Sequence, residues 1–266
     1  MFSGVELELS DLYLLESFQI SYLPGWIPEE EFACVIEHNP EIAVFLEKKY
    51  PPIALFINRI REENSSSVPD KCSRECAERL LWTIADMLVY GKCPEVYDSL
   101  DFHSWDFGEI TSITPLEGLT VIDAGSGTGR VALEAAETAS SVYAVEPVTR
   151  LRRFIREKAS LQNKSNLHVT DGFLHCMPFP DSFADVLITS HALGWRLDSE
   201  LREFERVVGN GGHIIHCPGT PLEDNSGSIH EVLISPEWGY SFGVYSETDG
   251  DKRKYWKQLS SISCSS

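Results

Sequence analysis

The 266-residue sequence has no hydrophobic run long enough to cross a membrane, and it is poor in basic side chains. Lysine and arginine total 22 against 41 aspartates and glutamates, which gives a formal net charge of −19 at pH 7. A membrane span needs ~20 apolar residues in succession, and so negative a surface repels phosphate backbones. We therefore expect neither a membrane protein nor one that acts on nucleic acid.

Signals for export and for a metal centre are also missing. The first nine residues lack the basic start and the apolar core of a signal peptide. The seven cysteines are irregularly spaced, and no two of them form a Cys-x-x-Cys pair. Cys72 and Cys76, with Cys93 and His103 further on, do not have the spacing of a zinc site. We expect reduced thiols, a cytoplasmic location and no metal.

A glycine-rich turn follows a short apolar run in the stretch 119–130. The apolar run predicts a buried strand, and the residues from 128 to 139 are good helix formers. Gly125, Gly127 and Gly129 let the backbone turn sharply and approach a ligand with no Cβ in the way. Their spacing is not the Gly-x-Gly-x-x-Gly of dinucleotide sites, and no Lys-Ser/Thr pair follows as in a P-loop. The stretch predicts a nucleotide-cofactor site; a plain strand-turn-helix corner is the alternative.

A carboxylate, Asp123, stands two residues before the first glycine. It would repel a phosphate, whereas it could accept hydrogen bonds from a cationic ligand or lie near one. The run from Asp123 through Gly129 resembles motif I of the class I S-adenosylmethionine-dependent methyltransferases.

Strands and helices alternate from residue 119 onward. We expect strands at 119–124, 141–146, 166–170, 184–190 and 212–217, with helices near 128–139, 147–161 and 198–208. This order predicts an α/β fold with a doubly wound, mostly parallel sheet that binds ligands at the carboxyl ends of its strands. Segments 240–245 and 254–259 suggest a closing hairpin. Class I methyltransferases end in such a pair, so the resemblance implies their seven-stranded Rossmann-like sheet over about residues 95–266.

The preceding part of the chain predicts helices only. Ser10 can cap the first helix, others begin near Glu29, Pro40 and Ile53, and Asp70 caps the longest, which Gly91 ends. We expect a helical N-terminal unit over 1–94 and a cofactor-binding domain over 95–266. No chemistry is visible in the helical unit, so it would wall the acceptor site, bind a protein partner or form a homodimer.

Two further carboxylates end predicted strands. Glu146 ends the second strand, 21 residues after Gly125, where a carboxylate can accept both ribose hydroxyls of a nucleoside; a solvated turn acid is the alternative. Asp171 ends the third strand, and in the methyltransferases an acid there accepts from the adenine amino group while the next backbone N–H reaches a ring nitrogen.

The segment 173–185 also resembles these enzymes. It is similar to the Leu-Pro-Phe-Pro-Asp-x-Ser-Phe-Asp run of methyltransferases of the type 11-like, small-molecule and quinone-ring group, with Met177 in place of the leucine and two extra residues before the Pro-Phe-Pro. The resemblance implies that S-adenosylmethionine is the cofactor, with S-adenosylhomocysteine as its product. The implied cofactor residues are Asp123, Ala124, Gly125, Ser126, Gly127, Gly129, Glu146, Pro147, Asp171, Gly172, Phe173 and Ser190.

Two residues are candidates for the methyl acceptor's side of the site. His191 follows the fourth strand, and a neutral imidazole there can take a proton near pH 7. Trp105 belongs to an aromatic segment, 92–118, that would wall the acceptor site. A histidine satisfied within its loop and aromatics that only pack the two parts together are the alternatives. The basic residues from 150 to 158 ring a helix, which favours a solvated surface.

The sequence thus predicts metal-independent, in-line methyl transfer to a small molecule. One alternative is an NAD(P)-dependent oxidoreductase, which the glycine spacing and the closing hairpin disfavour. Another is a non-catalytic partner protein that keeps the cofactor site.

Overall fold

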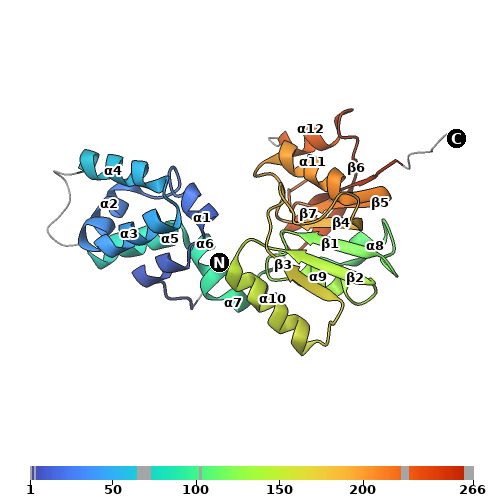
Figure 1. Ribbon diagram of the computed structural model, residues 1–266, viewed down its shortest axis with the longest axis horizontal. Helices are drawn as coiled ribbons and strands as arrows, with labels where there is room; N and C mark the ends of the chain where they lie inside the picture. Colours follow the sequence, from blue (N-terminus) through green and yellow to red (C-terminus); the bar gives the residue numbers. More distant parts are fainter. Residues whose placement is uncertain (1, 3, 65–72, 102–103, 223–227, 261–266) are drawn as a thin grey trace. The chain divides into compact units, whose positions relative to one another are not determined.

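The computed structural model describes residues 2, 4–64, 73–101, 104–222 and 228–260. The chain forms two compact units, Met1–Tyr97 and Asp98–Ser266 (Figure 1). The division falls three residues beyond the expected boundary at 94. The Tyr97 ring packs edge-on against Tyr90, with 4.1 Å between ring centroids, which ties the segment after residue 94 to the first unit.

The first unit contains helices and no strands among its described residues. Its elements are η1 Leu9–Leu14, α1 Ser17–Tyr22, α2 Glu29–His38, α3 Pro40–Lys49, α4 Ile53–Asn64, α5 Arg74–Thr83, α6 Ala85–Lys92 and the first part of α7 Pro94–Asp98. Buried leucine, isoleucine and phenylalanine side chains from η1 to α6 form one core. This unit therefore has a hydrophobic core of its own.

Several predicted helix bounds in this unit were wrong. Glu8, not Ser10, precedes the first helix, and Glu8 N–H donates to Asp11 Oδ2 at 2.8 Å. The predicted longest helix is two helices, α5 and α6, that meet at Ile84. Buried apolar residues continue across this break, so periodicity alone could not reveal it.

The caps of these two helices also differ from the prediction. Ser73 caps α5 and accepts from Cys76 N–H at 3.1 Å, whereas Asp70 lies outside the described residues. Gly91 lies inside α6 rather than ending it. It is buried, and a Cβ there would lie 3.8 Å from Leu14 Cβ, so a small residue suits this packing.

The second unit is built on one seven-stranded sheet. The strands are β1 Thr120–Ala124, β2 Ser141–Val145, β3 Leu167–Thr170, β4 Ala184–Ser190, β5 Val208–Cys217, β6 Ser241–Glu247 and β7 Gly250–Gln258. Their order is β3-β2-β1-β4-β5-β7-β6, and only β7 runs antiparallel to both of its neighbours. This confirms the predicted doubly wound, mostly parallel sheet with its closing hairpin.

Helices cover both faces of the sheet. They are α8 Gly108–Thr111, α9 Arg130–Ala135, α10 Thr149–Leu161, α11 Leu197–Val207 and α12 Ser228–Leu233. Successive residues of a strand point to opposite faces. Val121 thus belongs to the core under α8, α9 and α10, and Ile122 to the core under α11 and α12.

The predicted element boundaries need two corrections in this unit. β5 begins at Val208 rather than at 212, because Val208 pairs with Ala184 ahead of an irregularity in register. The short helices α8 and α12 were not predicted. No helix in the described ranges combines the length and the apolar character that a membrane crossing requires.

Candidate functional site

The glycine-rich turn links the carboxyl end of β1 to α9. Gly125, Gly127 and Gly129 have φ values of 75°, 54° and 85°, in the left-handed region that side chains disfavour. A Cβ on Gly125 would lie 2.5 Å from Ala192 Cβ, in the loop after β4. A Cβ on Gly129 would instead lie 2.8 Å from Ile155 of α10. Gly125 therefore lets two loops meet at the sheet edge, and Gly129 lets two helices pack closely.

Glu146 lies directly after β2 and is almost fully buried. Its Oε2 accepts from Gly127 N–H at 3.0 Å and its Oε1 accepts from Val148 N–H at 2.8 Å. Burial raises the pKa of this carboxyl to about 7, against the lowering effect of the two backbone donors. An ionised carboxylate has about four acceptor positions, so Glu146 keeps capacity for ligand hydroxyls beside the turn.

Asp123 is also buried, but its neighbours belong to the protein. Its Oδ2 accepts from Ala132 N–H of α9 at 3.0 Å, and Ser126 Oγ donates to the Asp123 carbonyl oxygen at 2.7 Å. Burial raises the pKa of Asp123 to about 7 as well. These contacts place the carboxyl behind the turn, where it satisfies an N-terminal N–H of α9.

The end of β3 carries the predicted adenine residues. The Asp171 carboxylate is exposed and pairs with Arg152 Nη1 at 3.0 Å. The same nitrogen donates to the carbonyl oxygens of Glu146 and Pro147, at 2.8 and 2.7 Å. Phe173 is partly exposed and stacks on His175. Arg152 thus fastens the ends of β2 and β3 together, and the prediction that this basic helix is only a solvated surface was wrong for Arg152.

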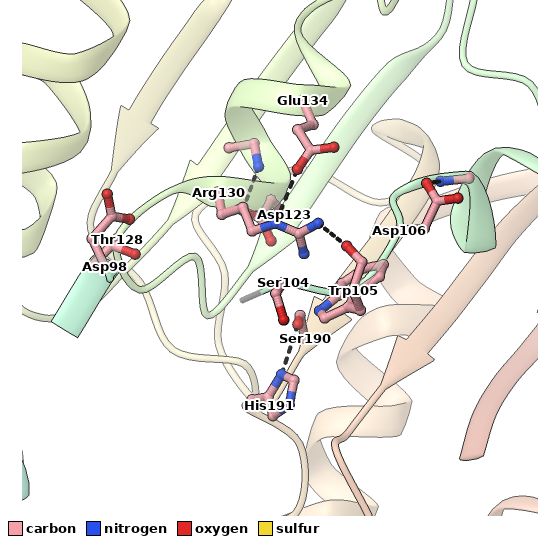
Figure 2. A network of polar contacts seen from close by, with 12 residues as sticks. Asp98, Ser104, Trp105, Asp106, Asp123, Thr128, Arg130, Glu134, Ser190 and His191 are labelled. Atoms are coloured by element: carbon pink, nitrogen blue, oxygen red, sulfur yellow. Dashed lines mark hydrogen bonds and ion pairs between the residues drawn. The ribbon is translucent and has the colours of Figure 1, made fainter. Parts of the chain in front are cut away.

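Ser190 ends β4, and His191 follows it at the same edge. Ser190 Oγ lies 3.0 Å from His191 Nδ1 (Figure 2). His191 Nε2 lies 3.0 Å from Glu247 Oε1 at the end of β6. His191 has a φ of 54°, which is uncommon for a residue with a side chain. The fold therefore joins the predicted histidine to an acid 56 positions later in the chain.

Trp105 is buried, with an exposed fraction of 2%. The Arg130 guanidinium lies over its indole, 4.4 Å from the ring centroid, and Arg130 Nη2 donates to its carbonyl oxygen (Figure 2). Among the described residues, Trp105 Nε1, Arg130 Nη1 and Thr128 Oγ1 are buried without a hydrogen-bond partner. Buried donors normally have a partner, so these orphaned groups beside the turn fit a ligand that carries acceptor atoms.

The sequence did not single out Arg130, Arg152 or Glu247. Arg130 directly follows the third glycine, a position that could have drawn attention to it. Arg152 was one of several basic residues on a single helix, and no local pattern marks it. Glu247 has no sequence signal, because only strand pairing brings the hairpin to His191.

No group of three or more potential metal-ligating side chains occurs within the described ranges. Cys72 and His103, two members of the cluster considered above, lie outside those ranges.

A doubly wound sheet with a glycine turn after β1 and a buried acid after β2 defines a nucleoside-binding class of α/β domain. Comparison with known proteins narrows this class. Residues 122–216 match the model of a family described as "Methyltransferase domain". Residues 122–216 of this chain are therefore similar to a methyltransferase domain.

Individual relatives agree with this assignment. An "Uncharacterized methyltransferase" of Anoxybacillus flavithermus is 26% identical over 136 residues, which are 49% of this chain and 59% of the relative. The aligned part thus spans less than two thirds of that protein.

Two solved structures share the fold. An S-adenosylmethionine-dependent methyltransferase of Aquifex aeolicus is 18% identical with a TM-score of 0.51, covering 62% of this chain and 98% of that one. A chain from the complex between the Haloferax volcanii Trm112 methyltransferase activator and the putative methyltransferase is 13% identical with a TM-score of 0.50, covering 63% and 92%.

Proposed function

We propose that this protein transfers a methyl group from S-adenosylmethionine to a small-molecule acceptor by in-line displacement, without a metal. The observation that carries the proposal is the placement of Glu146. Its buried carboxyl meets the backbone of the glycine turn and retains acceptor capacity, as the binding of a ribose requires.

The residues around the turn fit the rest of this cofactor. S-adenosylmethionine, when bound, supplies a methyl group on a positively charged sulfur that is already a strong electrophile. The unpartnered Trp105 Nε1 and Arg130 Nη1 would donate to its carboxylate. Asp171 and Gly172 would hold the adenine, with Phe173 beside them. The protein's contribution to catalysis would be to orient the two reactants and exclude water.

The acceptor would lie beyond the end of β4, because doubly wound sheets bind ligands past their strand ends and the cofactor would occupy β1 to β3. The loop from Ser190 to Trp195, together with Trp105, would bound this region. Its aromatic side chains suit a small, partly apolar acceptor. The net charge of −19 disfavours nucleic acid as the acceptor.

A protein partner or a homodimer through the acidic helical unit belongs to the same proposal. The Haloferax structure pairs a methyltransferase with an activator. This supports the proposal that a surface outside the catalytic site binds a protein partner. Light scattering on the purified protein would separate a dimer from a monomer.

Thermal-shift titration tests the cofactor. A ligand that binds only the native state raises the melting temperature, so S-adenosylhomocysteine should raise it whereas NAD and NADP should not. A rise with NAD or NADP alone would instead support the oxidoreductase.

A substitution at Glu146 tests the carrying observation. Glu146→Ala should weaken S-adenosylhomocysteine binding by about 1–3 kcal/mol, the effect of leaving buried ligand hydroxyls unpaired. Calorimetry would measure the loss. Glu157→Ala is the matched control, because Glu157 is exposed and pairs with Arg153 on the same helix. Equal affinities for the two variants would contradict the ribose assignment.

The acceptor requires an unbiased screen. Purified protein would be incubated with labelled S-adenosylmethionine and fractionated small-molecule extracts. Labelled products would identify the acceptor and the methylated atom. Cofactor binding without transfer to any fraction would favour the non-catalytic partner protein.

A further inference from the structure

Two adjacent residues, Ser190 and His191, and the distant Glu247 form a continuous polar line at one edge of the sheet. Ser190 Oγ lies 3.0 Å from His191 Nδ1, and His191 Nε2 lies 3.0 Å from Glu247 Oε1. Tyr245 donates its hydroxyl to the same Glu247 oxygen at 2.6 Å. β6 runs in the same direction as β4 and β5, because β7 is antiparallel to both β5 and β6. The carboxyl end of β6 therefore lies at the cofactor edge.

The charge on Glu247 sets the tautomer of His191. Burial would raise the pKa of Glu247, but its contact with His191 and the hydroxyl of Tyr245 outweigh burial and lower it. Glu247 is therefore ionised near neutral pH. A carboxylate can only accept, so the 3.0 Å contact favours a proton on the facing Nε2. Nδ1 is then unprotonated and accepts from the Ser190 hydroxyl.

The other groups around this line do not compete for the proton. Burial raises the pKa of the Tyr245 hydroxyl, which keeps it a donor, and raises that of the Cys217 thiol to about 12. Lys252 is buried near Glu247 and pairs with the exposed Asp249 at 2.8 Å. Within the described part of the chain, Glu247 is the carboxylate in contact with the ring, and Asp249 lies near enough to interact with it electrostatically.

The backbone holds the imidazole in place at some energetic cost. His191 has a φ of 54°, and left-handed residues with side chains persist where the surrounding structure demands them, often at functional sites. The His191 N–H donates to the Cys217 carbonyl oxygen at 3.0 Å, and a Cβ on Gly219 would overlap the ring. Trp105 packs edge-on against Tyr245, 5.6 Å between centroids, and so supports the donor to Glu247.

We propose that Ser190, His191 and Glu247 form a proton relay, and that the acceptor is a hydroxyl or amine compound that loses a proton on methylation. The inference rests on the methyltransferase function proposed above. The acceptor lone pair forms the bond to the methyl carbon, and the electrons of the broken carbon–sulfur bond stay on sulfur. The acceptor proton passes to Ser190 Oγ as the Ser190 proton passes to His191 Nδ1. Glu247 is a positioning residue that stabilises the resulting imidazolium.

The first experiment needs no cofactor and no turnover. Nitrogen NMR of the histidine side chains in the ligand-free protein reports which ring nitrogen of His191 carries the proton. We expect the Nε2–H tautomer in the wild type and a mixture of tautomers in Glu247→Gln. An Nδ1–H tautomer in the wild type would overturn the relay whatever the enzyme's activity.

The second experiment measures transfer to the acceptor that the screen identifies. His191→Asn removes the base while keeping a residue that tolerates the left-handed backbone, and should lower kcat by roughly 10²–10⁴-fold. Glu247→Gln should lower kcat on the order of tenfold or more, because the imidazolium loses its counter-charge. It should also move the acid limb of the kcat profile to lower pH. Glu157→Gln, which removes an exposed acid on α10 that pairs with Arg153, is the matched control and should leave both quantities unchanged.

The results separate this inference from the function on which it rests. Neither His191→Asn nor Glu247→Gln should change S-adenosylhomocysteine affinity measured by calorimetry. No binding to the wild type would overturn the methyltransferase function, and the relay's part in transfer with it. Normal binding with unchanged kcat and pH profiles in both variants would overturn the relay alone. An acceptor with no proton to lose, such as a tertiary amine or a thioether, would overturn the inferred acceptor class.

Discussion

At the scale of single residues, Asp123 and Glu146 are two buried carboxyl groups with pKa values raised to about 7. Burial is the main cause for both, and the charge of Asp123 also raises the pKa of Glu146. Ionised carboxylates are costly to bury without full pairing. Ionisation of these two groups therefore destabilises the ligand-free folded protein, to an extent that depends on pH.

This cost predicts how stability depends on pH. The folded-state pKa of Glu146 exceeds its unfolded value of 4.5. Between about pH 4.5 and 7 the folded protein therefore binds more protons than the unfolded protein. The stabilising contribution of Glu146 falls as pH rises through that window. The glutamine of Glu146→Gln does not ionise. From pH 5 to pH 8, the free energy of unfolding of this variant should therefore rise by about 3 kcal/mol relative to that of the wild type. Urea unfolding across this range measures the difference. If the unfolding free energies of the two proteins changed with pH in parallel, the raised pKa of Glu146 would be contradicted.

Gly125 and Gly118 offer a second test at this scale. They have nearly equal φ values, 75° and 77°, but a Cβ would lie 2.5 Å from Ala192 Cβ at Gly125 and would meet nothing within 4 Å at Gly118. Both alanine variants strain the backbone, whereas only Gly125→Ala also displaces the loop after β4.

We expect Gly125→Ala to weaken S-adenosylhomocysteine binding by about tenfold or more, roughly 1.4 kcal/mol, and Gly118→Ala to leave the affinity unchanged. Calorimetry on both folded variants makes the comparison. Similar affinities would mean that the fit between the two loops does not shape the cofactor site.

At the scale of elements, the cap of α5 shows what a single side chain contributes to a helix. Ser73 Oγ accepts from Cys76 N–H at 3.1 Å. Ser73→Ala should lower the unfolding free energy of the helical unit by about 1 kcal/mol, whereas Ser73→Asp should preserve it, since aspartate is an equally good capping residue. Chemical unfolding followed by far-ultraviolet circular dichroism measures both variants. An equally large loss of unfolding free energy in Ser73→Asp would show that the missing cap does not cause the loss in Ser73→Ala.

The predicted elements differ in how well periodicity defined them. β1 to β5 and the hairpin were predicted because apolar runs and turn residues bound each strand. The break at Ile84 between α5 and α6 was missed, since apolar residues on both sides keep the helical spacing. The short α12 was also missed, and a six-residue helix is too short for a periodic signal.

At the scale of the whole molecule, the two units have separate hydrophobic cores. A compact unit with its own core can unfold independently. We expect calorimetric unfolding to show two transitions. S-adenosylhomocysteine should raise the melting temperature only of the transition that belongs to Asp98–Ser266. A truncated protein of residues 98–266 should keep the ligand-sensitive transition. One transition that moves as a whole would show that the units unfold together.

The sequence by itself determined the class of the fold and predicted which edge of the sheet would hold a cofactor. The order of apolar runs specifies a doubly wound sheet, and the turn from Asp123 to Gly129 with Glu146 marks where a nucleoside would bind. These signals are local, because the backbone geometry of a glycine turn and the burial of a strand depend on neighbouring residues.

Tertiary structure alone decided which distant side chains meet there. It turned Asp123 toward α9, joined Arg152 to Asp171, and brought Glu247 within 3.0 Å of His191. Strand order and register determine these contacts. Order and register in turn depend on pairing between segments that are remote in the sequence. A histidine can be singled out from its place after a strand, but the acid that orients it becomes visible only once the hairpin has closed the sheet.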